Sequence, residues 1–112
     1  MYSAGSTPQP DVHPLARATL ENRFGIDTAS LHPKSLNRFV DHHFDYVITV
    51  CDRAAESCPV FPGDPQRIHW SFADPAAVQD ATEQRRAFER VATEVAARIR
   101  IWLSLPDVAR LL

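Results

Sequence analysis

One apolar run limits the folds open to this chain more than any other feature. The stretch FDYVITVC covers residues 44–51, is rich in β-branched and aromatic residues, and carries no charge after Asp45. Such residues favour strands. Apolar residues at consecutive positions, without alternation, are typical of a strand covered on both faces, as in a parallel sheet. We therefore predict a buried strand over residues 44–51 within an α/β fold.

The C-terminal third of the chain contains the clearest helix signal. Asp80 and Glu83 form a D-x-x-E capping pattern. Apolar residues then recur at spacings of three and four from Phe88 to Leu103, which places them on one helix face. We expect Pro106 to end this helix.

Weaker signals fill the rest of the chain. Pro14 suits the first position of a helix that Gly25 ends. Residues 1–6 and 67–72 are expected strands, and residues 36–40 an expected helical turn. Strands that alternate with helices predict a mostly parallel sheet. With 112 residues and no internal boundary, we expect a single domain over residues 1–112.

Composition excludes several classes of partner. A formal charge of −2 gives no reason to expect nucleic acid or an anionic membrane surface. No stretch reaches the roughly 18–20 apolar residues of a membrane span. The first residues, MYSAGSTPQP, lack the pattern of a secretory signal. We expect a cytoplasmic protein without a cofactor.

The two cysteines are the first candidates for chemistry. Cys51 ends the predicted strand, and six residues separate it from Cys58. Cytoplasmic thiols are kept reduced, so a close pair is more often catalytic or metal-binding than a structural disulfide. Three interpretations stay open: two core residues, a zinc clip assisted by His69, or a redox pair. The last needs a loop that brings the two Cα atoms within about 7 Å.

Longer motifs carry a resemblance to a known family. The segments DYVITVCDRAAESCPVFPGDP and IHWSFADPAA, followed by the long helix, resemble the thioredoxin-coupled arsenate reductases of the low-molecular-weight tyrosine phosphatase fold. YSAGS with HPLA downstream fits the early part of the same family. The resemblance implies a three-layer α/β fold with a parallel sheet flanked by helices.

The resemblance also implies a reaction. In that family a P-loop cysteine attacks arsenate, and an aspartate protonates the departing oxygen. A second cysteine then releases arsenite, and a third forms a disulfide with the second, which thioredoxin or another thiol reductant reduces. By position Cys51 matches the second cysteine, Cys58 the third and Asp74 the general acid. General acid catalysis needs a protonated carboxyl group beside the leaving oxygen.

Two departures from the family pattern shape the expectations. No C-x₅-R-S motif occurs in the sequence, so we expect a domain truncated at its N-terminus that does not turn over arsenate alone. An exposed strand edge then predicts a homo-oligomer or a complementing N-terminal segment. The second departure concerns potassium. Ser3 is a weak candidate ligand, but Lys34 stands where the family has an aspartate, and lysine cannot ligate a cation.

Two alternatives come from other functional classes. The first alternative to an arsenate reductase-like protein is a non-catalytic remnant that binds a partner, and the second is a low-molecular-weight tyrosine phosphatase-like protein. The phosphatase is the weaker reading because hydrolysis of a phosphate ester needs no C-x₆-C loop. His69 and Trp70 are expected to pack the end of a strand beneath the Asp74 loop.

Overall fold

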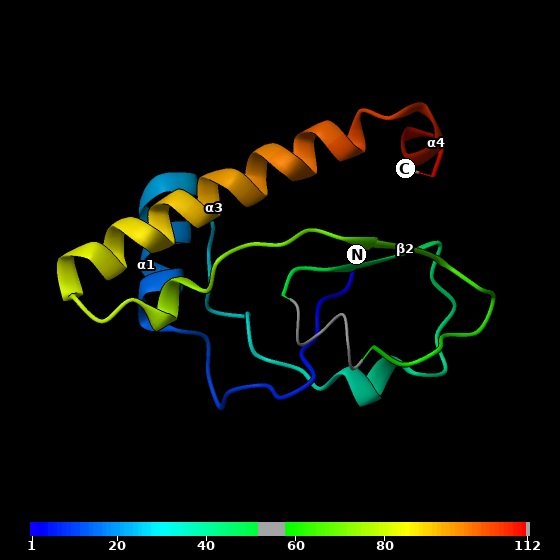
Figure 1. The fold of residues 1–112 in the computed structure, drawn as a ribbon, viewed down its shortest axis with the longest axis horizontal. Coiled ribbons are helices and arrows are strands. Elements are labelled where there is room, and N and C mark those ends of the chain that lie inside the picture. The colour runs from blue at the N-terminus through cyan, green and yellow to red at the C-terminus, as the bar shows by residue number, and fades with distance from the viewer. Residues whose placement is uncertain (52–57, 112) are drawn as a thin grey trace. The chain divides into compact units, whose positions relative to one another are not determined.

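The computed structural model describes residues 1–51 and 58–111 (Figure 1). Its α-helices and strands are α1 (Pro14–Phe24), β1 (Tyr46–Thr49), β2 (Gln66–His69), α3 (Ala81–Leu103) and α4 (Pro106–Ala109). The short 3₁₀ helices are η1 (Leu36–Phe39) and η2 (Pro75–Ala77). The chain divides into two compact units, one of Met1–His13 with Ala29–Asp74 and one of Pro14–Thr28 with Pro75–Leu112.

The first unit contains the sheet. β1 and β2 run parallel, with Tyr46 opposite Gln66 and Thr49 opposite His69. The predicted parallel pairing is therefore confirmed, together with the α/β class. Beyond the strands, the N–H of Phe72 donates to the carbonyl of Val50 at 3.2 Å, so the two segments stay together.

The predicted burial of the first strand is wrong. All four residues of β1 are only half-buried. Within the described residues the sheet has two strands, so β1 pairs with β2 alone. A short two-stranded ribbon cannot cover both of its faces as a larger sheet does.

The expected strand over residues 1–6 is also wrong. Gly5 makes a single parallel bridge with Ser35, in which the Gly5 N–H donates to Lys34 and the Leu36 N–H donates to Gly5, both at 2.9 Å. On the C-terminal side the pairing stops because η1 begins at Leu36. η1 itself confirms the expected helical turn.

Aromatic side chains form the core of the first unit. Phe39, Phe61 and Trp70 are buried. An aromatic cluster joins rings from residues that are distant in the sequence, namely Tyr2, Phe39, His42, Phe44 and Phe61. Phe61 stands edge-on to Phe44, with ring centroids 5.4 Å apart. The cluster therefore holds the segment that follows Cys58.

In the second unit, α1 confirms both predicted boundaries. Pro14 is its first residue, and Gly25 follows its last residue with a φ of 63°, a conformation that favours glycine. Arg23 of α1 pairs with Glu89 of α3 at 3.5 Å. The hydroxyl of Thr28, which is almost fully buried, donates to Glu21 of α1.

The long helix α3 begins as predicted and ends slightly earlier than expected. Asp80 accepts a hydrogen bond from the Glu83 N–H at 3.0 Å, as an N-cap does. The helix ends at Leu103, and Pro106 begins α4 instead of ending α3. Phe88 is buried, whereas the rest of the apolar stripe is half-buried. Across the described residues, no helix combines the length and the apolar content that a bilayer span requires.

Candidate functional site

Cys51 lies just beyond the end of β1, where it is exposed to solvent. The hydrogen bond from Phe72 to Val50 fixes the backbone immediately before it. Because the side chain is exposed, the interpretation of Cys51 as a core residue is wrong. An accessible sulfur at the carboxyl end of a parallel strand stands where open α/β sheets place their sites.

Cys58 is half-buried and lines a cavity of about 140 Å³, which we call the Cys58 cavity. Its lining residues are Val47, Thr49, Cys58, Arg67, Ile68 and His69. Both cysteines are thiols in this structure. The loop that we expect to bring them together, residues 52–57, lies outside the described residues.

Strand register explains which side chains surround this cavity. Val47 pairs with Arg67, and Thr49 pairs with His69, two residues further along each strand. Residues two apart on a strand point to the same face of the sheet. The four side chains therefore share the face that Cys58 lies against. Alternation in the stretch RIH is the sequence signal that could have placed His69 in the site.

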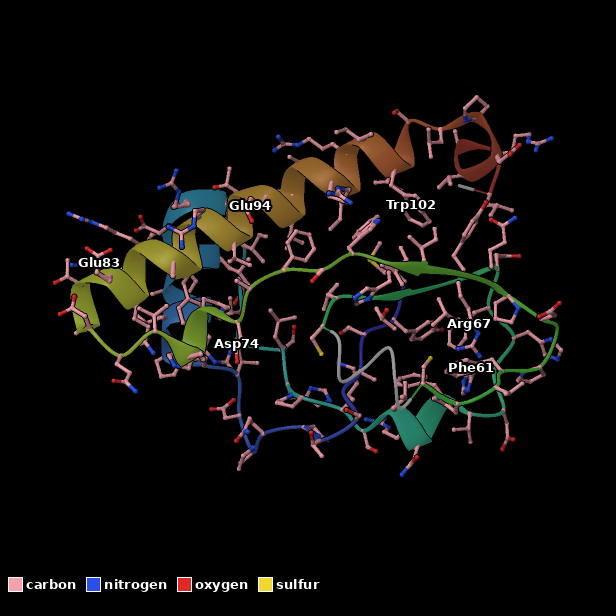
Figure 2. The ribbon with its side chains drawn as sticks, viewed as in Figure 1. Phe61, Arg67, Asp74, Glu83, Glu94 and Trp102 are labelled. Carbon is pink, nitrogen blue, oxygen red and sulfur yellow. The ribbon has the colours of Figure 1, made fainter. Side chains whose placement is uncertain are left out.

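Two hydrogen bonds order the polar side chains of the Cys58 cavity. The Thr49 hydroxyl lies 2.6 Å from Nδ1 of His69. Nη2 of Arg67 donates to the carbonyl of Pro59 at 2.7 Å, which ties the residue after Cys58 to β2. Figure 2 shows Arg67 projecting from this strand. The cavity therefore places a permanent positive charge near the Cys58 sulfur.

Asp74 lies in the segment that follows β2, away from the Cys58 cavity. It is exposed, it follows Phe72 by two residues, and it immediately precedes η2. Figure 2 shows it beyond the end of β2, away from Arg67. Because Phe72 is hydrogen-bonded to Val50, Asp74 and Cys51 both follow the same end of the paired strands. Asp74 is not among the described residues that line the Cys58 cavity. Its role as general acid stays a prediction.

Ser3 lies in a different cavity, of about 340 Å³, which Lys34 also lines. Nζ of Lys34 donates to the carbonyl of His32 at 3.1 Å. The lysine charge opposes a second cation in this cavity. Potassium binding at Ser3 stays a prediction. Among the described residues, no group of three or more His, Cys, Asp or Glu side chains is placed to hold a metal ion.

Comparison with known proteins gives consistent matches. The model of the family described as low molecular weight phosphotyrosine protein phosphatase matches residues 1–111. An arsenate reductase of Shouchella clausii is 35% identical over 101 residues, which cover 89% of this chain and 71% of that protein. Arsenate reductases of Halalkalibacterium halodurans and Bacillus subtilis are 34% and 33% identical, with the same coverage.

Proposed function

Because the chain belongs to the low-molecular-weight phosphotyrosine protein phosphatase family, we propose that it is the redox part of an arsenate reductase. The observation that carries the proposal is the placement of two thiols beside one strand pair. Cys51 is exposed at the end of β1, and Cys58 lines a cavity against β1 and β2. Relatives named arsenate reductase favour this activity over hydrolysis of a phosphate ester.

The proposed reaction begins outside these 112 residues. The sequence contains two cysteines and no C-x₅-R-S motif, so the loop that binds arsenate and attacks arsenic comes from another segment. Asp74 donates a proton to the departing arsenate oxygen. The loop cysteine is then joined to As(V) through a sulfur–arsenic bond.

Two sulfur attacks follow. The Cys51 thiolate attacks the sulfur of the loop cysteine, and the electron pair of the sulfur–arsenic bond moves to arsenic, which leaves as arsenite, As(III). Cys58 attacks the Cys51 sulfur of the mixed disulfide, forms the Cys51–Cys58 disulfide and releases the loop cysteine as a thiolate. Thioredoxin or another thiol reductant returns both cysteines to thiols. The exposure of Cys51 supports its role because an attacking thiolate must be accessible.

Arsenite production tests this proposal. The 112-residue chain, supplied with arsenate, thioredoxin, thioredoxin reductase and NADPH, is expected to form no arsenite. The same chain joined at its N-terminus to a strand and a C-x₅-R-S loop is expected to turn over. In the joined protein, Cys51→Ser abolishes arsenite formation, and Asp74→Asn slows it.

The Cys58→Ser variant separates the two sulfur attacks. It is expected to release about one arsenite per chain and then stop, because nothing resolves the mixed disulfide. Val60→Ala is the matched control, since that side chain is 88% exposed in the same loop. Sustained turnover by the 112-residue chain alone, or full activity of the joined protein without Cys51, would contradict the proposal.

A further inference from the structure

We propose that the Cys58 cavity is a subsite for a small anionic thiol, which reduces the Cys51–Cys58 disulfide by attacking Cys58. This inference rests on the proposed function, because it needs that disulfide to form. It adds the chemical class of a direct reductant and the side chains that select it. Arg67 and His69 recognise the carboxylate of the thiol, Thr49 orients the His69 ring, and the sulfur of Cys58 receives the attacking thiolate.

The charge of the cavity carries the first step of the argument. Arg67 is permanently cationic, and none of the six described residues that line the cavity is acidic. Its planar guanidinium has five N–H donors, and the bond to Pro59 occupies Nη2. A carboxylate is the partner that this geometry fits best.

The pair of Thr49 and His69 supplies the second step. When the Thr49 hydroxyl donates to Nδ1, the proton of the neutral imidazole is on Nε2, which is then a donor. When the imidazole is protonated, Nε2 is again a donor and the ring is a second cation. In these two states Nε2 presents an N–H that suits an anion at this face of β2, whereas the neutral tautomer with its proton on Nδ1 does not.

Size and surface define the ligand further. The cavity holds about 140 Å³, close to the roughly 150 Å³ that accommodates a benzene molecule in a protein interior. A thiol of about five non-hydrogen atoms, such as mercaptoacetate, matches that volume. Val47 provides an apolar wall for its methylene group.

The reduction is a pair of thiol–disulfide exchanges. The thiolate of the anionic thiol attacks the Cys58 sulfur, the bond between Cys58 and Cys51 breaks, and Cys51 leaves as a thiolate that takes up a proton. A second thiol molecule then attacks the sulfur of the first thiol in its mixed disulfide with Cys58. Its attack releases Cys58 as a thiol and yields the oxidised, disulfide-linked form of the small thiol.

A series of small thiols that differ in charge tests the proposal. The 112-residue chain is oxidised, and its reduction is followed with mercaptoacetate, 2-mercaptoethanol and cysteamine. Each rate is divided by the rate at which the same thiol reduces 4,4′-dithiodipyridine, an uncharged disulfide, which removes differences in intrinsic nucleophilicity. We expect the normalised rate to be about fivefold higher for mercaptoacetate than for 2-mercaptoethanol, and lowest for cysteamine. High salt should reduce this preference.

Variants assign the preference to the cavity. Arg67→Met should remove most of it, and Arg67→Lys should restore part of it, because lysine keeps the charge without the planar fork. His69→Gln is a second test that leaves Arg67 in place, and it should weaken the preference for mercaptoacetate. Arg38→Met is the matched control, since Arg38 lies over the Phe39 ring and does not line the cavity.

Each outcome has one meaning. Equal normalised rates in the wild type, or an unchanged preference in Arg67→Met, would overturn the anionic subsite and leave the proposed function standing. Failure of the chain to form the Cys51–Cys58 disulfide would overturn both. Loss of the preference in the Arg67 and His69 variants alone would establish the subsite.

Discussion

Replacing Phe61 by alanine should destabilise the unit that carries both cysteines. Phe61 lies three residues after Cys58, and only 3% of its surface is exposed. Its ring stands edge-on to Phe44 at an angle of 87°. The substitution removes the ring contact that joins the segment after Cys58 to the aromatic cluster.

The expected magnitude follows from burial. A buried aromatic side chain hides roughly 150–250 Å², and its removal from a core costs about 3–5 kcal/mol. The edge-to-face pair with Phe44 accounts for about 0.5–1.5 kcal/mol of the stabilisation. We expect the free energy of unfolding to fall by about 3 kcal/mol, the low end of that range, because the adjacent Val60 is exposed and the site can partly collapse.

Urea denaturation measures this change. Trp70 is buried in the same unit and reports unfolding by fluorescence in a Trp102→Phe background, which removes the other tryptophan. With a slope of about 2 kcal/mol per molar urea, the midpoint should fall by about 1.5 M. The urea midpoint of Phe61→Leu should fall by less, and this variant replaces Phe61→Ala in the test if the alanine variant does not fold.

The neighbouring residue provides the control. Val60 is 88% exposed, so Val60→Ala should change the free energy of unfolding by less than about 0.5 kcal/mol. If Phe61→Ala shifted the midpoint no more than Val60→Ala does, Phe61 would not anchor the Cys58 segment, and the description of the core would be wrong.

Three further changes should have smaller effects on unfolding. Asp80→Ala removes the N-cap of α3 and should lower the stability measured by thermal unfolding by about 1 kcal/mol. Asp107 is an exposed helix residue, and Asp107→Ala should lower the stability by less than about 0.5 kcal/mol. Equal effects of the two substitutions would contradict the role of Asp80 as the cap. Gly63→Ala should lower the free energy of unfolding in urea by more than about 1 kcal/mol, because φ is 82° and the new Cβ would lie 2.9 Å from Nδ1 of His43. Partial recovery of stability in the double variant with His43→Ala would identify the clash, and no recovery would leave backbone strain as the cause. Gly25→Ala meets no atom within 4 Å, so it should cost only the strain of a φ of 63°, about 1 kcal/mol, and no loss would contradict that strain.

Local rules predicted the boundaries that depend on single residues. The Asp80 cap, the start of α1 at Pro14 and its end before Gly25 all follow from backbone preferences within one turn. The parallel direction of the sheet was expected from the alternation of strands with helices, and β1 and β2 are parallel. The burial of β1 could not be predicted in this way, because it depends on the number of neighbouring strands, which is a property of the whole sheet.

From the sequence, Arg67 was missed as a site residue and His69 was named only as a possible zinc ligand. His69 and Arg67 reach the Cys58 cavity only because β2 pairs with β1 at one particular offset. A shift of one residue would turn both side chains to the other face. The aromatic cluster was likewise missed, since Tyr2 and Phe61 are joined by the fold and share no local pattern. The cysteine motif, by contrast, is readable from its spacing.

Disulfide mapping of the 112-residue chain tests the central claim most directly. The reduced protein is treated with one equivalent of a mild oxidant, remaining thiols are alkylated, and the digest is analysed by mass spectrometry. Our account predicts that Cys51 and Cys58 are recovered in one intramolecular disulfide, which thioredoxin reduces. Recovery of both cysteines as alkylated thiols, or only as cross-links between chains, would contradict it.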